Sequence, residues 1–139
     1  MKTSGDDARK ILVVEDEPGI SQVCQRTLTS EGFEVDIAVN GKVAQDMSEE
    51  KQYDLFLVDI KMPTMNGKEL YQWLEEKHPQ QADWVIFTTG SVLGKDTETF
   101  IEQTGKPFLL KPFTCDELKV IIRETLRRRA KWLKNEKPY

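Results

Sequence analysis

The sequence has little cysteine and no long hydrophobic run. Its two cysteines among 139 residues, Cys24 and Cys115, lie far apart and form no CxxC motif, which argues against a disulfide framework or a zinc site. No apolar stretch approaches the roughly 20 residues of a membrane span. The first ten residues carry two aspartates and lack the apolar core of a signal peptide. We therefore expect one folded domain, without a membrane span, in the reducing cytoplasm.

A surplus of basic charge is also missing, because 20 Lys and Arg residues stand against 24 Asp and Glu residues, for a net charge of −4. Residues 123–139 hold seven of the basic and two of the acidic residues, a charge of +5, which leaves 13 basic and 22 acidic residues, a charge of −9, in the rest. A folded nucleic-acid binder needs a basic face, so we expect no direct nucleic-acid partner. We predict a disordered N-terminal segment over 1–8, a folded domain over 9–128 and a basic helical extension or tail over 129–139.

Apolar segments of strand length alternate with stretches of helical periodicity along the chain. The expected strands are residues 11–14, 33–39, 54–59, 83–89 and a shorter one at 108–110. Five helices are expected after them: one from Pro18 to Gly32, one from Asn40-Gly41, one ending at His78-Pro79, one capped by Asp96 and ended by Gly105, and one starting with the capping box Thr114–Glu117. Strands with continuous apolar runs are typical of parallel sheets covered on both faces. The fold class is therefore α/β, with a doubly wound parallel sheet.

Charged and hydroxyl residues follow the predicted strands. Glu15 and Asp16 follow the first strand, Asp59 closes the third, Thr89 closes the fourth and Lys111 follows the fifth. An aspartate at such a position commonly caps the next helix, and for Asp16 or Asp59 alone that interpretation stays open. Three carboxylates that meet at one sheet edge repel each other unless a cation is bound, and Mg²⁺ suits such oxygen ligands better than zinc does.

The same residues suit phosphoryl transfer. Lys111 offers a positive charge and Thr89 a hydroxyl where phosphoryl oxygens would lie, and Asp59 is the candidate carboxylate nucleophile. Glu15 and Asp16 are then left to hold the metal ion.

Four separated motifs resemble the receiver domains of response regulators in two-component signalling. They are ILVVEDEP (11–18), DLFLVDIKMPTMNG (54–67), IFTTG (86–90) and FLLKPF (108–113). The resemblance covers about residues 9–128 and implies a flavodoxin-like receiver fold, with five helices and a five-stranded sheet in the order 2-1-3-4-5. The passage at 102–107 is similar to receivers attached to hybrid histidine kinases.

The resemblance also implies a metal-dependent phosphoacceptor. A histidine kinase or a histidine phosphotransfer protein would donate a phosphoryl group from a phosphohistidine to Asp59. Asp16, Asp59 and the backbone carbonyl of Lys61 would bind Mg²⁺ directly, and Glu15, an aspartate in most receivers, would act in the outer shell. Lys111 would pair with the phosphoryl group, and its peptide bond to Pro112 would be cis.

A conformational switch is implied as well. The Thr89 hydroxyl would turn toward the aspartyl phosphate, with the adjacent Thr88 as the alternative, and the Phe108 ring would turn inward with it. From the residues alone, a core aromatic is the favoured interpretation of Phe108. Lys61 and Ser91 would influence the lifetime of the phosphoryl group. The partner-binding face would comprise the fourth and fifth predicted helices and the fifth strand, through which a homodimer is also possible.

Alternative functions remain open at this stage. An aspartyl-phosphate phosphohydrolase typically has a second acid two residues after its nucleophile, where this chain has Lys61. An FMN carrier should have a Ser/Thr/Gly-rich loop after its first strand, where this chain has residues 15–18, Glu-Asp-Glu-Pro. A docking receiver that works without phosphorylation is a third possibility. We expect a signalling phosphoacceptor that does not turn over an external substrate, as a stand-alone receiver, part of a larger kinase or a piece of a longer regulator.

Overall fold

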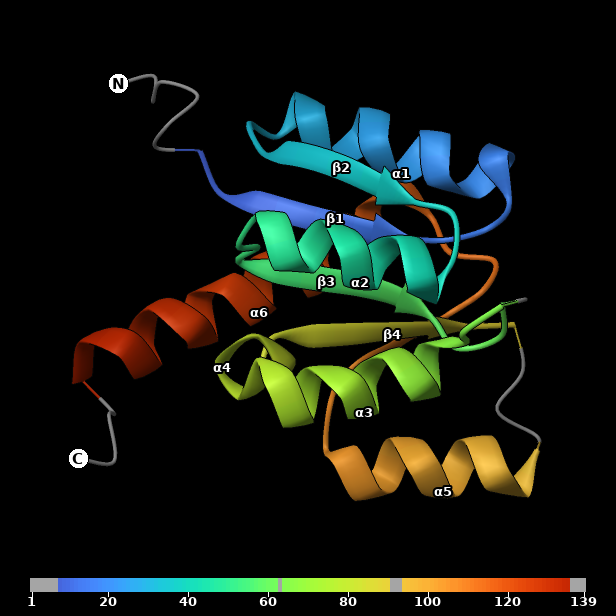
Figure 1. The fold of residues 1–139 in the computed structure, drawn as a ribbon. Helices are drawn as coiled ribbons and strands as arrows, with labels where there is room; N and C mark the ends of the chain where they lie inside the picture. The colour runs from blue at the N-terminus through green and yellow to red at the C-terminus, as the bar shows by residue number, and fades with distance from the viewer. Residues whose placement is uncertain (1–7, 63, 91–93, 136–139) are drawn as a thin grey trace.

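The five apolar segments form one parallel sheet in the computed structural model, which describes residues 8–62, 64–90 and 94–135 (Figure 1). The strands are β1 (Lys10–Val14), β2 (Glu34–Ala38), β3 (Leu55–Asp59), β4 (Val85–Thr89) and β5 (Phe108–Leu110). Their order across the sheet is β2-β1-β3-β4-β5, and every neighbouring pair is parallel. The predicted strand order and fold class are confirmed.

Six helices lie in the described part of the chain, where five were expected. They are α1 (Pro18–Ser30), α2 (Gly41–Glu50), α3 (Gly67–Lys77), α4 (Pro79–Ala82), α5 (Lys95–Thr104) and α6 (Cys115–Asn135). The additional helix is α4, a single turn that begins at Pro79 directly after α3. Proline suits the first helical position, which needs no N–H donor, and the carbonyl of His78 accepts the amides of Gln81 and Ala82. The fourth and fifth predicted helices are therefore α5 and α6.

Capping side chains define the starts of α3 and α6. The predicted capping box of α6 is confirmed, with Thr114 Oγ1 accepting from the Glu117 amide at 3.0 Å and Glu117 Oε1 accepting from the Thr114 amide at 2.8 Å. Asn66 and Glu69 form an equivalent box at α3 that was not predicted. The expected cap of α5 at Asp96 is wrong, because the helix begins one residue earlier and Asp96 lies in its first turn.

The sheet is covered on both faces, so its strands divide two apolar cores. Figure 1 shows α1 and α6 on one face and α2, α3 and α5 on the other. Alternate residues of β1 point to opposite faces: Ile11 and Val13 join the core under α1 and α6, whereas Leu12 and Val14 join the other core. Short connections lead from the carboxyl ends of the strands to the helices that follow, and polar side chains collect at this edge.

Helix α6 continues without a break past residue 128 to Asn135. In Figure 1 its last turns extend beyond the amino ends of the strands. The proposed boundary between a domain over 9–128 and an extension over 129–139 stays a prediction, and the predicted disorder of 1–8 falls almost entirely outside the described residues. Over the ranges that the structure describes, no helix combines the length and the apolar character needed to cross a membrane.

A hydrogen bond between Tyr53 and Asp36 gives a test of the packing around β2. The Tyr53 hydroxyl donates to Asp36 Oδ2 at 2.7 Å, and Lys51 Nζ lies 3.0 Å from the same oxygen. Burial favours the neutral carboxyl, but these two donors outweigh it and hold the pKa of Asp36 below its ordinary value. We predict that Tyr53→Phe lowers the free energy of unfolding by about 1–2 kcal/mol near neutral pH, because a carboxylate loses a donor.

Urea denaturation measures this loss. A carboxyl group whose pKa is lowered in the folded state contributes stability above its unfolded pKa, and that contribution disappears as the pH falls through the folded pKa. The cost of Tyr53→Phe should therefore shrink as the pH falls below the ordinary pKa of an aspartate. It should also shrink in an Asp36→Asn background, and an unchanged cost there would contradict the assignment.

Candidate functional site at the carboxyl edge of the sheet

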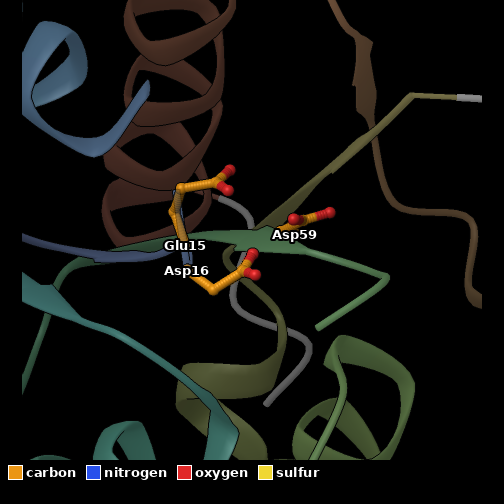
Figure 2. A group of neighbouring side chains, drawn as sticks. All are labelled: Glu15, Asp16 and Asp59. Atoms are coloured by element: carbon orange, nitrogen blue, oxygen red, sulfur yellow. The ribbon is translucent and has the colours of Figure 1, made fainter. Parts of the chain in front are cut away.

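Three carboxylates meet where β1 and β3 end. Glu15 and Asp16 directly follow β1, Asp59 is the last residue of β3, and the register pairs Val14 with Val58. Figure 2 shows the three side chains directed toward one common space. One carboxylate oxygen from each residue lies within 4.8 Å of the others. This confirms that the predicted acidic residues come together, and their hard oxygen ligands fit the chemistry of Mg²⁺.

Lys111 completes the cluster from the end of β5, the edge strand of the sheet. It follows β5, yet its Nζ atom lies 2.8 Å from Glu15 Oε1 and 3.0 Å from Asp59 Oδ2. Its amide donates to the Thr89 carbonyl at 2.8 Å, which fixes its backbone against β4. The Lys111–Pro112 bond is cis, as predicted. A single ammonium group thus bridges two carboxylates from two different strands.

These three charged groups are shielded from water, which shifts their pKa values. The Glu15 and Asp59 side chains are 3% and 5% exposed, and that of Lys111 is 13% exposed. Burial raises the pKa of Asp59 and the pKa of Glu15, and the hydrogen bonds from Lys111 lower them only in part. Burial alone would lower the pKa of Lys111, but its two carboxylate partners raise it above its ordinary value. Lys111 therefore stays charged between two carboxylates that repel each other.

Backbone groups also shape the surroundings of Asp59. The Lys61 amide donates to Asp59 Oδ1 at 3.2 Å, while the Lys61 side chain is exposed. Gly67, the first residue of α3, donates its amide to the Ile60 carbonyl at 2.9 Å. A β-carbon at Gly67 would overlap the carbonyl oxygen of Asp59. This glycine lets the chain return close to the phosphoacceptor candidate, a role that sequence reasoning missed although the Asn66-Gly67 pair marks the helix start.

The two candidate switch residues lie on β4 and β5. Thr89 is fully buried, and Thr88, the alternative, pairs in register with Asp59 and is 3% exposed. Phe108, on the edge strand β5, pairs in register with Phe87 on β4. The Phe108 residue is 42% exposed, so it is not a core residue in this conformation. Ser91 lies outside the described residues.

Comparisons with known proteins agree with this fold. The family model of the response regulator receiver domain matches residues 11–123. Response regulator ArlR from Staphylococcus epidermidis is 33% identical over 118 residues, which are 85% of this chain and 52% of that protein. The crystal structure of a CheY-like response regulator receiver domain protein from Methanospirillum hungatei superposes with a TM-score of 0.82 and 28% identity, and covers 90% of this chain and 98% of that one.

A third relative is the response regulator protein TrrA from Thermotoga maritima, whose structure was solved in complex with Mg²⁺-BeF. It has a TM-score of 0.73 and 30% identity, and the match covers 84% of this chain and 98% of that one. The chain belongs to the response regulator receiver domain family of two-component systems. It spans about half the length of the full-length relatives that it matches. The resemblance to receivers of hybrid histidine kinases stays a prediction.

The charge balance of the site can be tested through stability. We predict that Lys111→Met lowers the free energy of unfolding by about 3–5 kcal/mol, because it leaves two buried carboxylates without a counter-charge. The matched control is Lys51→Met, which also removes an ammonium group paired with two carboxylates, Glu34 and Asp36. Lys51 is 35% exposed, so its loss should cost about 1 kcal/mol or less.

Chemical denaturation near neutral pH measures both effects. In an Asp59→Asn background, which removes one of the two buried charges, Lys111→Met should cost clearly less. Equal costs for Lys111→Met and Lys51→Met in the wild-type background would contradict this electrostatic account.

Proposed function

We propose that this receiver accepts a phosphoryl group on Asp59, in a Mg²⁺-dependent reaction in the cytoplasm. The donor is the phosphohistidine of a histidine kinase or of a histidine phosphotransfer protein. One observation carries the proposal: the Asp59 carboxylate closes β3 at the sheet edge, 3.0 Å from the Lys111 ammonium and beside Glu15 and Asp16. The phosphorylated domain then changes its affinity for a partner or for an attached output domain.

The chemistry follows from the groups around Asp59. A carboxylate oxygen of Asp59 attacks the phosphorus atom, the phosphorus–nitrogen bond of phosphohistidine breaks, and the imidazole leaves with the electron pair. Lys111 lies where its positive charge balances the phosphoryl oxygens. The Lys61 amide, 3.2 Å from Asp59 Oδ1, holds the carboxylate in a fixed orientation. These groups are in place before a donor arrives, so little reorganisation is needed.

The metal site uses the same carboxylates. Asp16, Asp59 and the Lys61 carbonyl would bind Mg²⁺, and Glu15 would act at longer range because it is occupied by Lys111. The ion would neutralise charge that develops on the phosphoryl oxygens. The Mg²⁺-BeF complex of the Thermotoga maritima relative supports this assignment.

The site favours a phosphoacceptor over a phosphohydrolase. Lys61 occupies the position where such an enzyme needs its second acid, and its side chain is exposed. We expect the domain to assist its own phosphorylation and slow dephosphorylation without turning over an external substrate. Lys61 and Ser91 would set the lifetime of the phosphoryl group, and a receiver that docks without phosphorylation is the second candidate.

An apolar hollow beside the site suits the approach of a donor protein. It has a volume of about 390 Å³ and is lined on the α1 side by Gly19, Ile20 and Val23, with Pro112 and Phe113 opposite. Lys111 also contributes to its wall. A donor seated there would hold its phosphohistidine close to Asp59.

The output face is built from α5, β5 and α6. Phe108 and Leu110 on β5 and Val120 on α6 are 42%, 47% and 50% exposed. Thr89 and Phe108 form the proposed switch: when the Thr89 hydroxyl binds the phosphoryl group, space opens for the Phe108 ring to turn inward. This face would then bind a partner protein or a second copy of the domain.

Intact-mass measurement after incubation with acetyl phosphate and Mg²⁺ tests the phosphoacceptor. The wild-type chain should gain one phosphoryl group, and Asp59→Asn should gain none. Asp46→Asn, which removes an exposed carboxylate on α2 that is 66% accessible, is the matched control and should be modified like the wild type. Omitting Mg²⁺ should reduce the yield strongly. The proposal fails if the wild type stays unmodified or if Asp59→Asn gains an equal adduct.

NMR spectra with beryllofluoride and Mg²⁺ test the switch separately. Both the Thr89 and the Phe108 signals should shift in the wild type. Thr89→Val removes the hydroxyl with little change in size, so it should abolish most of the Phe108 shift, whereas Thr88→Val should retain it. If only Thr88→Val abolishes the shift, then Thr88 is the switch residue. An unchanged Phe108 signal in the wild type would contradict the coupling.

A further inference from the structure

Two tryptophans meet at the end of the sheet opposite to Asp59. Trp84 directly precedes β4, and Trp132 lies in the last turns of α6. Their ring centroids are 6.3 Å apart in an edge-to-face arrangement, and both residues are half-buried. Trp132 lies past residue 123, where the match to the receiver family ends. The tryptophan pair is therefore a feature of this chain rather than of the phosphorylation site.

Two adjacent hollows share this tryptophan pair. One has a volume of about 540 Å³ and is lined by Lys106 and Arg128. The other, of about 740 Å³, extends to Leu133, and the carboxylate residue Asp83 lines both hollows. Together they form a trough along the last turns of α6, which Figure 1 places beside α4. We name this trough the Trp groove and define it by Trp84, Lys106, Arg128, Trp132 and Leu133.

The Trp groove lies at the basic end of an acidic protein. The Arg128 guanidinium donates to the Thr125 hydroxyl at 3.3 Å and forms no ion pair with any residue that the structure describes. Lys106 is 3.8 Å from the exposed Asp83. Lys131 and Lys134 are exposed nearby on α6, whereas the chain before residue 123 has a net charge of −9. Positive charge beside indole rings is complementary to an acidic segment with an apolar side chain.

Packing alone does not account for all of these residues. Arg129 and Trp132 hold the end of α6 to the body, since Arg129 Nη1 lies 3.5 Å from Asp54 Oδ1. Arg128 is exposed, and Leu133 is 40% exposed on the same turns. Tryptophan and arginine are also the residue types that contribute most binding energy in protein interfaces.

We infer that the Trp groove binds an acidic peptide segment of a partner protein. Carboxylates of the segment pair with Arg128 and Lys106, and one aliphatic or aromatic side chain packs beside Trp84, Trp132 and Leu133. Guanidinium groups bind carboxylates through paired hydrogen bonds. This binding requires no phosphoryl group on Asp59, so its failure would leave the proposed phosphoacceptor function untouched.

An NMR titration of the full, unphosphorylated chain tests the inference. The probe is an acetylated and amidated peptide in which glutamates flank a single leucine, and the control peptide carries lysines in place of the glutamates. The acidic peptide should shift the indole signals of Trp84 and Trp132 in a saturable way. The indole signal of Trp73, a residue of α3 whose ring packs against His78, should not move. The lysine peptide should shift none of them.

Charge-reversal variants locate the contact. Arg128→Glu should weaken binding of the acidic peptide about tenfold or more, and Leu133→Ser should weaken it as well. Both residues are exposed, so circular dichroism should show an unchanged fold. The matched control is Lys42→Glu, which reverses an exposed charge on α2 and should leave the affinity unchanged.

Several results would overturn the inference. One is the absence of shifts at Trp84 and Trp132, and another is equal weakening by Lys42→Glu, which would indicate nonspecific attraction. Stronger binding of a short DNA duplex than of the acidic peptide would assign the surface to nucleic acid instead. Sedimentation that shows a dimer disrupted by Arg128→Glu would assign it to a second copy of the chain.

Discussion

The bridge from one buried ammonium to two buried carboxylates organises this receiver. Lys111 lies within 3.0 Å of both Glu15 and Asp59, and each of the three side chains comes from the end of a different strand. Removing charges from water is costly, so such a cluster persists only with close pairing. The protein retains it where hydrophobic residues would serve stability equally well, which is typical of groups kept for function.

The fold positions this bridge through backbone contacts rather than through the charges themselves. The parallel register of β1 and β3 brings Glu15 and Asp59 to one edge, and the hydrogen bond from the Lys111 amide to Thr89 aligns β5 with β4. Gly67 leaves room for the loop after β3 to pass the Asp59 carbonyl. The strand pair that Thr89 and Lys111 join in this way also carries Phe108. The same two strands thus contribute to both the site and the proposed output face.

The sequence was sufficient for the features that depend on local pattern. Alternating apolar segments predicted the parallel sheet, and the polar residues after the strands predicted that Glu15, Asp59 and Lys111 meet. Features that depend on close three-dimensional packing were missed. Helix α4 is a single turn that begins at Pro79. It was missed because Pro79 was interpreted only as the signal that ends α3. Position 67 needs glycine because the backbone at Asp59 lies close to it in the fold. Trp84 and Trp132 are in contact although they are distant in the sequence. The exposure of Phe108 depends on its place on an edge strand.

In the proposed function, Asp59 and no other carboxylate becomes phosphorylated. Borohydride reduction of the phosphorylated wild-type chain converts an aspartyl phosphate to homoserine, and peptide mass mapping then identifies the residue. Homoserine is expected at position 59 alone. Homoserine at position 16, a reduced glutamate at position 15, or a phosphoryl group on His78 would contradict it.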